Sequence, residues 1–439
     1  MTFHSIDLKL ILRALQHRNY RLYFYGQTIS LIGTWAQRLA VGWLVYRLTG
    51  SALVLGVVGF VGDLPAFLFA PIAGVLADRW PRYRIVVLVQ SLAMIQALVL
   101  AFLVLTGAVT VGYIIALSMF LGLLNAFDVP TRQALLVELI ERREDLGNAI
   151  ALNSSMVNAA RLLGPSLAGV LIATVGEGMC FLLNAISYVA VIASLLAMKI
   201  RPSQREATGA RVLQELKQGF AYVFGFVPMR SILLLVGLTS LMGVPYQILM
   251  PVFAKDILHG GPFVLGFLMG CSGVGALAGA IYLAARKSVM GLESVIAGAA
   301  GIFGIGLIAF SLSRVLWLSL ALMMLTGFGM IAQLSSSNTV LQTIAEDDKR
   351  GRVLSFYTMA YRGMVPLGSL LAGSLANWIG APGTLFFGGT CCVAGSALFA
   401  SKLSFLREAI HPVYARMGYL SEEGSGIPKP TDAGVPLEE

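Results

Sequence analysis

Long apolar runs separated by short polar connections recur along the whole chain. Each run holds roughly 18 to 26 residues, enough to cross the ~30 Å hydrocarbon core of a bilayer at about 1.5 Å per residue. A backbone in lipid must satisfy its own hydrogen bonds, and these runs are too long for barrel strands, so they predict helices. We predict twelve spans, at about 22–46, 52–77, 85–106, 111–136, 146–173, 179–198, 229–253, 263–285, 292–313, 315–343, 352–379 and 384–403.

One long connection divides the twelve spans into six and six. Residues 1–198 form the first half, with an amphipathic leader at about 5–21 that is either a surface helix or a disordered basic segment. Residues 199–228 form a linker with a predicted surface helix at 211–224, and residues 229–403 form the second half. The tail, 404–439, ends in a run rich in Gly and Pro, which predicts partial disorder.

Composition and charge distribution agree with this pattern. The chain is 57% apolar and only 12% charged, which excludes a soluble protein. With the N-terminus in the cytoplasm, all but six of the 31 basic residues fall in cytoplasmic segments. The positive-inside rule therefore predicts that both termini are cytoplasmic, and the net charge of +9 needs no nucleic acid to explain it. The six exceptions are three in outer loops (Arg47, Lys255, Arg314) and three within spans (Arg38, Arg161, Arg362).

No set of residues suggests enzyme chemistry. The four cysteines have neither zinc nor redox spacing, and the four histidines lie at the edges of the apolar runs. The glycine-rich run at 266–279 is not followed by Lys and Ser or Thr, so it predicts close helix packing and not a nucleotide site. We therefore predict no enzyme activity, no metal and no cofactor.

The two halves share a spaced pattern that indicates an internal duplication. Three matches occur in the correct order, the first two at an offset of 210 residues and the third at 201. Such a layout is expected of a transporter that binds its substrate near the membrane midplane, between the halves. The matches are Ser30-Leu31-x-Gly33-x3-Gln37-x-Leu39 with 240–249, Val54-Leu55-Gly56 with 264–266, and Ala159-x-Arg161-x3-Pro165 with 360–366.

The loop after the second span, GVLADRWPRYR at 74–84, resembles the signature loop of the major facilitator superfamily, with Pro81 in place of a glycine. The segment NAFDVPTRQA at 125–134 and the segment RLLGPSLAG at 161–169 are similar to the branch of enterobactin exporters and macrolide efflux pumps. The resemblance implies the major facilitator fold in a bacterial inner membrane. It also implies a cytoplasmic gate made by Gly74, Asp78, Arg79, Arg82, Asp128 and Arg132.

Two departures from the family pattern bear on mechanism. The second half lacks the acidic signature loop, because residues 279–287 keep the glycine and the basic residues but hold no Asp. We therefore expect an asymmetric cytoplasmic gate. The Gly-Pro segment of the fifth span matches the family's antiporter motif only in part.

Charges within spans are costly and therefore informative. They fall on spans 1, 2, 4, 5 and 11, which in the resembled fold line the cavity, and not on spans 3, 6, 9 and 12. For each of these charges the alternative to a functional role is a structural ion pair or an arginine bound to backbone carbonyls. Arg38 could also extend outward to the membrane surface, and Arg161 and Arg362 could brace their helices. The candidates for contacting substrate are Gln37, Arg38, Arg161, Gln247 and Arg362. For Gln37 and Gln247 an interhelical hydrogen bond is the alternative.

Asp63 is the candidate for proton coupling. It lies 11 residues into the second span, so roughly 17 Å deep at about 1.5 Å per residue. Desolvation at that depth opposes ionisation, whereas a neighbouring cation such as Arg38 or Arg161 favours it. The alternative is a permanent pair with an arginine that never titrates.

The predicted function is export of a small amphipathic molecule or siderophore by proton antiport. The partners we expect are a small-molecule substrate, protons and the lipid bilayer, with no nucleic acid, and we expect a monomer. Two alternatives stay open: a lysophospholipid flippase or importer of the same fold, and a membrane scaffold or embedded enzyme.

Overall fold

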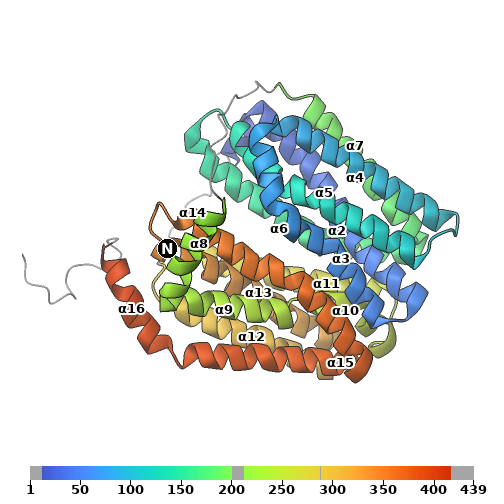
Figure 1. The fold of residues 1–439 in the computed structure, drawn as a ribbon. Helices are drawn as coiled ribbons and strands as arrows, with labels where there is room; N and C mark the ends of the chain where they lie inside the picture. Colours follow the sequence, from blue (N-terminus) through green and yellow to red (C-terminus); the bar gives the residue numbers. More distant parts are fainter. Residues whose placement is uncertain (1–11, 200–211, 287, 417–439) are drawn as a thin grey trace, which may run out of the picture.

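The computed structural model describes residues 12–199, 212–286 and 288–416 (Figure 1). The described chain is built of helices joined by short connections. The helices of the first part are α2 (Arg18–Thr49), α3 (Ala52–Arg79), α4 (Arg82–Leu105), α5 (Val111–Glu138), α6 (Leu146–Val175) and α7 (Glu177–Leu196), with short 3-10 turns η1 (Arg13–Gln16) and η2 (Arg143–Asp145). Those of the second part are α8 (Val212–Gly225), α9 (Val227–Met242), α10 (Tyr246–Val252), η3 (Phe253–Ile257), α11 (Pro262–Ala284), α12 (Leu292–Leu312), α13 (Leu316–Ile344), α14 (Arg350–Thr358), η4 (Met359–Gly363), α15 (Met364–Ala400) and α16 (Leu403–Arg416).

Ten helical stretches of the described chain are long and apolar enough to cross a membrane. The stretch Arg350–Ala400 counts as one of them, although the backbone at Gly380 leaves helical geometry (φ 75°, ψ 162°). The 32-residue helix α2 is not among the ten. The chain is thus a multi-pass membrane protein whose spans are helical, as the apolar runs predict.

Contacts made by the N-terminal segment and by the connections between helices identify the two ends of the helix bundle. At one end, which we name the termini end, His17 contacts Asp145, and Asn19 donates a hydrogen bond to the carbonyl oxygen of Lys199. At the other, the opposite end, Arg47 at the end of α2 pairs with Glu177 at the start of α7.

Figure 1 shows α2 to α7 gathered in one group and α9, α11, α12, α13 and α15 in another. The groups meet along α3 with α15 and α6 with α11. Both contacts are made through glycines, since a Cβ on Gly56 would lie 2.9 Å from the Cα of Gly373, and one on Gly169 would lie 2.8 Å from the Cα of Gly266. Such contacts require backbones to approach without side chains between them. These four glycines lie in the parts of their helices toward the opposite end.

The predicted span 229–253 is interrupted. Helix α9 ends at Met242, the chain turns at Gly243–Pro245, and α10 leads into the π-helical turn η3. Pro245 and Pro251 lack backbone N–H donors, so a continuous ladder of hydrogen bonds cannot form there. Gln247 and Ile248, which follow the break, line a cavity described below.

Two helices outside the predicted spans pack at the termini end. Helix α8 agrees with the surface helix predicted at 211–224. Helix α16 has no counterpart among the predicted elements, and it buries Leu406, Ile410 and Tyr414 at a spacing of four residues. Tyr414 also donates a hydrogen bond to Glu293 Oε1 at 2.9 Å. The leader up to residue 11, the linker 200–211 and the tail from 417 lie outside the described residues.

Candidate functional site

A cavity of about 240 Å³ lies between the two groups of helices. Helices α2, α3 and α5 form one wall, and α10, α11 and α15 contribute to the other. Most of the lining is apolar, including Val58, Ile248 and Met269, with a small number of polar side chains. A mostly apolar pocket with a few polar groups is the usual form of a small-molecule site.

The charged pair of this cavity is Arg38 and Asp63. Arg38 Nη2 donates a hydrogen bond to Asp63 Oδ2 at 2.8 Å, and both residues line the cavity. The two side chains are 58% and 33% exposed, so the pair faces open space instead of being packed in a core. The two charges singled out on the first and second spans therefore meet in the central cavity.

Trp35 connects this pair to Arg161 on α6. The guanidinium carbon of Arg161 lies 5.2 Å from the Trp35 ring centroid, and that of Arg38 lies 5.9 Å from it. Arg161 Nε is buried without a hydrogen-bond acceptor. In the described chain no carboxylate lies within ion-pair distance of Arg161. Trp35 itself lines the cavity, and no sequence pattern pointed to it.

The two glutamines predicted to be equivalent have different surroundings. Gln37 is 2% exposed, donates a hydrogen bond to Gln96 Oε1 at 3.0 Å, and accepts one from Asn184 at 2.7 Å. Its amide is therefore engaged in tying α2 to α4 and α7. Both glutamines line the cavity, but Gln247, on α10, is only partly buried.

Arg362 lies in the π-helical turn η4 and is exposed, whereas its predicted counterpart Arg161 is partly buried in regular helix. The next residue, Gly363, lies against the ring of Phe67, one helical turn from Asp63. Arg362 thus lies beside the central contact of α3 with η4, but it is not among the residues that line the cavity.

The predicted gate residues lie at the termini end. Asp128 is 7% exposed, accepts a hydrogen bond from Gln90 at 2.8 Å, and pairs with Arg132 at 3.3 Å. Arg82 donates to Glu138 Oε1 at 2.8 Å, a partner that the sequence did not suggest. Helix α3 ends at Arg79 and α4 begins at Arg82, so no continuous helix joins Asp78 to Arg82. The gate residues Gly74, Asp78 and Arg79 lie near the end of α3.

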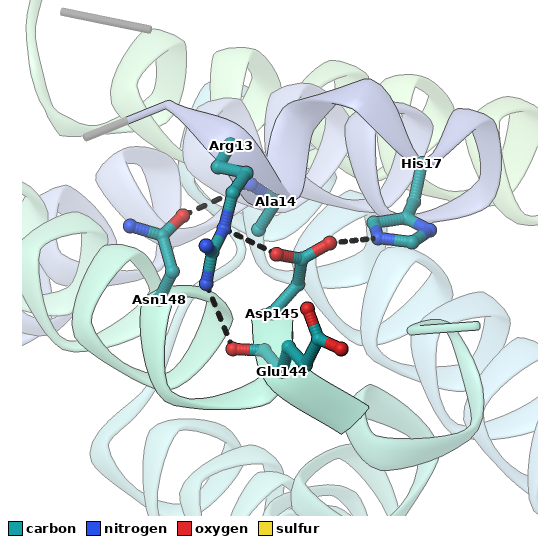
Figure 2. Close-up of polar contacts among 6 residues, drawn as sticks. All are labelled: Arg13, Ala14, His17, Glu144, Asp145 and Asn148. Carbon is teal, nitrogen blue, oxygen red and sulfur yellow. Dashed lines mark hydrogen bonds and ion pairs between the residues drawn. The ribbon is translucent and has the colours of Figure 1, made fainter. Parts of the chain in front are cut away.

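A second charged cluster lies at the same end (Figure 2). Asp145 pairs with Arg13 through one carboxylate oxygen and with His17 Nε2 at 2.9 Å through the other. Arg13 also donates to the carbonyl oxygen of Glu144 at 2.8 Å, and Asn148 accepts from the backbone N–H of Ala14 at 2.9 Å. Hydrogen bonding by His17, followed by the charge of Arg13, lowers the pKa of Asp145. The cluster fixes the N-terminal segment to the connection between α5 and α6.

Curated relatives of this chain are transporters. It is 26% identical to the staphyloferrin A transporter of Staphylococcus aureus over 384 residues, which cover 87% of this chain and 96% of that protein. It is 27% identical to the multidrug efflux pump Tap of Mycolicibacterium fortuitum over 353 residues, covering 78% and 85% of the two chains. The macrolide efflux protein A of Streptococcus pyogenes is 23% identical over 398 residues, covering 86% and 96%.

Solved structures share the fold. A bacterial homologue of the iron transporter ferroportin, in an inward-facing state, superposes with a TM-score of 0.67 at 18% identity, over 88% of this chain and 98% of that one. A bacterial homologue of the lysosomal transporter Spinster, inward-facing and unoccupied, gives 0.65 at 14% identity, over 91% and 98%.

The helices that build the cavity all fall within residues 11–414, the stretch that matches the family of transmembrane secretion effectors. The match covers more than half of the chain and includes the signature loop and both helix groups. The chain therefore belongs to the transmembrane secretion effectors of the major facilitator superfamily.

Proposed function

We propose that this protein exports a small amphipathic molecule or siderophore by proton antiport with alternating access. The observation that carries the proposal is the Arg38–Asp63 pair, which sits half-exposed on the wall of the central cavity. A carboxylate in a membrane span is a functional candidate by default, and this one can be reached from the cavity. The names of the relatives, a siderophore transporter and efflux pumps, support export of a small molecule.

The proposed architecture is twelve spans in two six-helix halves. The ten candidate stretches become eleven with α2, and twelve when Arg350–Ala400 is divided at the Gly380 break. In this architecture residues 1–198 and 229–403 are the halves, 199–228 the linker and 404–439 the tail. The helix groups of Figure 1 support this division.

Coupling follows from the geometry of the pair. Ionised Asp63 neutralises Arg38, and protonation of Asp63 releases it. One proton therefore changes the charge and the hydrogen-bonding capacity of the cavity wall at the place where substrate binds. A proton taken up from the outer side and released to the cytoplasm would complete an antiport cycle.

We propose that the termini end is cytoplasmic and that the protein sits in a bacterial inner membrane as a monomer. In a cysteine-free background, single cysteines replacing Lys255 and Arg314 should react with an impermeant maleimide added outside. Cysteines replacing Arg84, Arg205 and Lys349 should react only after the membrane is opened; of these positions, 205 lies outside the described residues. Outside labelling of position 84 or 349 would reverse the orientation.

The glycine contacts at the opposite end point to an inward-open state. Replacing Gly373 with Leu would force a side chain into the backbone of α3 at Gly56, so the opposite end should open. A cysteine replacing the cavity residue Val58 should then label from outside several times faster than in the parent protein. The matched control is Gly237→Leu, because a Cβ at Gly237 meets nothing within 4 Å. Equal labelling in both variants would contradict a closure made by these glycines.

The function itself is tested by transport in proteoliposomes with an imposed pH gradient and a substrate panel of siderophores, macrolides and lysophospholipids. Uphill movement of a siderophore or drug against proton flow would support the proposal. Transport of lysophospholipid without dependence on the gradient would favour the flippase. Movement of substrate together with protons would favour an importer.

A further inference from the structure

We infer that Arg161 and Trp35 form a head-group site for an anion, so that the substrate is an amphipathic carboxylate or a molecule carrying an equivalent anionic group. The inference rests on the proposed transport function and names the chemical class that the cavity takes. Its starting point is the charge balance of the described residues around Trp35. Arg38 is paired with Asp63 on the cavity wall, whereas Arg161, which is not itself among the residues that line the cavity, lies over the Trp35 ring without a carboxylate.

Asp63 is committed to Arg38. The pair is joined by a hydrogen bond of 2.8 Å, and no comparable partner exists for Arg161 among the described residues. A guanidinium keeps its charge at every physiological pH and carries five N–H donors in a fork that fits a carboxylate. The described residues around Trp35 therefore carry one positive charge more than they neutralise.

The environment of Arg161 raises the cost of leaving it unpaired. Its Nε is fully buried and finds no acceptor, so one donor has lost water without gaining a protein partner. The residue as a whole is only partly buried, so the rest of its side chain is not fully enclosed by protein. An incoming anion supplies what the protein lacks here, an acceptor and a counter-charge.

Trp35 places the apolar part of the ligand beside this charge. Its ring lines the cavity, and the guanidinium carbons of Arg161 and Arg38 lie 5.2 and 5.9 Å from the ring centroid. Gly164, one turn from Arg161, makes the approach of α6 to Trp35 feasible, because a Cβ there would collide with the Trp35 side chain. The remaining walls, such as Leu55, Val58 and Ile248, offer apolar surface to the body of the molecule.

Other ligand charges fit less well. A cation would meet two arginines and only one carboxylate near Trp35, and a neutral ligand would leave the Arg161 charge uncompensated. An anion also leaves a cell in the direction favoured by an inside-negative membrane potential. Its export would thus draw on the potential as well as on the proton gradient.

The test is binding of three matched amphiphiles to the purified full-length protein. The probes are 4-hexylbenzoate, 4-hexylbenzamide and 4-hexylbenzylammonium, which share one body and differ in head-group charge. Wild type should bind the benzoate at least about tenfold more tightly than the other two, the gain typical of a charge-assisted pair. Arg161→Gln should reduce this preference to nearly one, and Arg161→Lys should keep part of it.

Two further variants separate the roles. Trp35→Ala should weaken all three probes together, because it removes the shared apolar contact and leaves the charge. Arg230→Gln, which removes an exposed cation at the start of α9, should change nothing. Elution as a single symmetric species shows that each variant is folded, and the Lys variant carries the test if the Gln variant is not.

The outcomes distinguish this inference from the proposed function. Equal binding of the probes, no binding of the benzoate, or a preference that survives in Arg161→Gln overturns the anion site. If a neutral or cationic solute is nevertheless exported against its gradient, export stands without the anion site. If the benzoate is bound selectively but never moved under any gradient, the anion site stands and export fails.

Discussion

Two aspartates of this protein pair with arginines, but they differ in burial and in the number of carboxylate oxygens that are paired. Asp145, in the cluster of Figure 2, is 5% exposed and has both carboxylate oxygens paired, one with Arg13 and the other with His17. Asp63, in the central cavity, uses one oxygen for one contact, and its partner Arg38 is 58% exposed.

The difference in pairing indicates a difference in purpose. A carboxylate whose two oxygens are both occupied and buried holds two chain segments in one arrangement. A half-exposed pair is worth little to stability, about 0–1 kcal/mol, so its formation and loss change the fold very little. Loss of Asp145 should therefore be felt in stability, and loss of Asp63 in transport.

The largest expected effect is that of Asp63→Asn. The amide keeps the size of the side chain but cannot release and rebind a proton, so uptake driven by a pH gradient into inverted vesicles should be abolished. Exchange of labelled for unlabelled substrate should continue, because it needs no net proton movement. Expression and melting temperature should match those of wild type.

A matched control is Glu177→Gln. Glu177 pairs with Arg47 at 2.7 Å at the opposite end, outside the cavity, so this change removes a paired carboxylate without touching the proposed coupling site. Its gradient-driven transport should survive. If Asp63→Asn keeps gradient-driven uptake, or loses exchange while still folded, Asp63 is not the coupling carboxylate.

The membrane-spanning helices could be predicted from the sequence, because hydropathy and length decide where a helix can cross lipid. The predicted spans 85–106 and 179–198 differ by a few residues from α4 and α7. The interruption at Gly243–Pro245 was missed, because the apolar run continues across it and hydropathy does not register a change in backbone geometry. Helix α16 was missed because its 14 residues are too few, and too often polar, to stand out as an apolar run.

Only the charged residues of the site could be predicted from the sequence, because charges are unusual within membrane spans. That rule singled out Arg38, Asp63 and Arg161. The structure places Arg38 and Asp63 in the cavity lining and Arg161 over Trp35, which also lines the cavity. It did not identify Trp35, because an aromatic residue in an apolar run is not unusual. It was equally silent on the partners of Gln37, since Gln96 and Asn184 are brought to it by tertiary packing.

Asp78→Asn should have an effect of intermediate size. The resemblance to major facilitators places Asp78 in a gate at the termini end, where Asp128 is held by Gln90 and Arg132. If the aspartate helps to latch that end in the outward-open state, its loss should slow transport several-fold at unchanged expression. Reactivity of cavity cysteines from the cytoplasmic side should rise in parallel. Failure of the variant to insert would identify a folding clamp and not a latch.

The smallest effect, and the one that completes the contrast with Asp63, is that of Asp145→Asn. The lowered pKa of Asp145 means that the ionised carboxylate is favoured in the folded state. Its contribution to the free energy of unfolding is therefore complete above the ordinary Asp pKa of about 3.9. That contribution is lost as the pH falls through the lowered pKa of the folded state. At pH 7 the variant should melt about 2 °C lower than wild type. The gap should persist across the neutral range and narrow only in acid below about pH 3.9. Gradient-driven transport measured well below the melting temperature should be unchanged, because the cluster lies at the termini end and not in the cavity. A loss of transport at unchanged melting temperature would mean that the Asp145 cluster takes part in the transport cycle. The distinction between a structural carboxylate, Asp145, and a functional one, Asp63, would then be wrong.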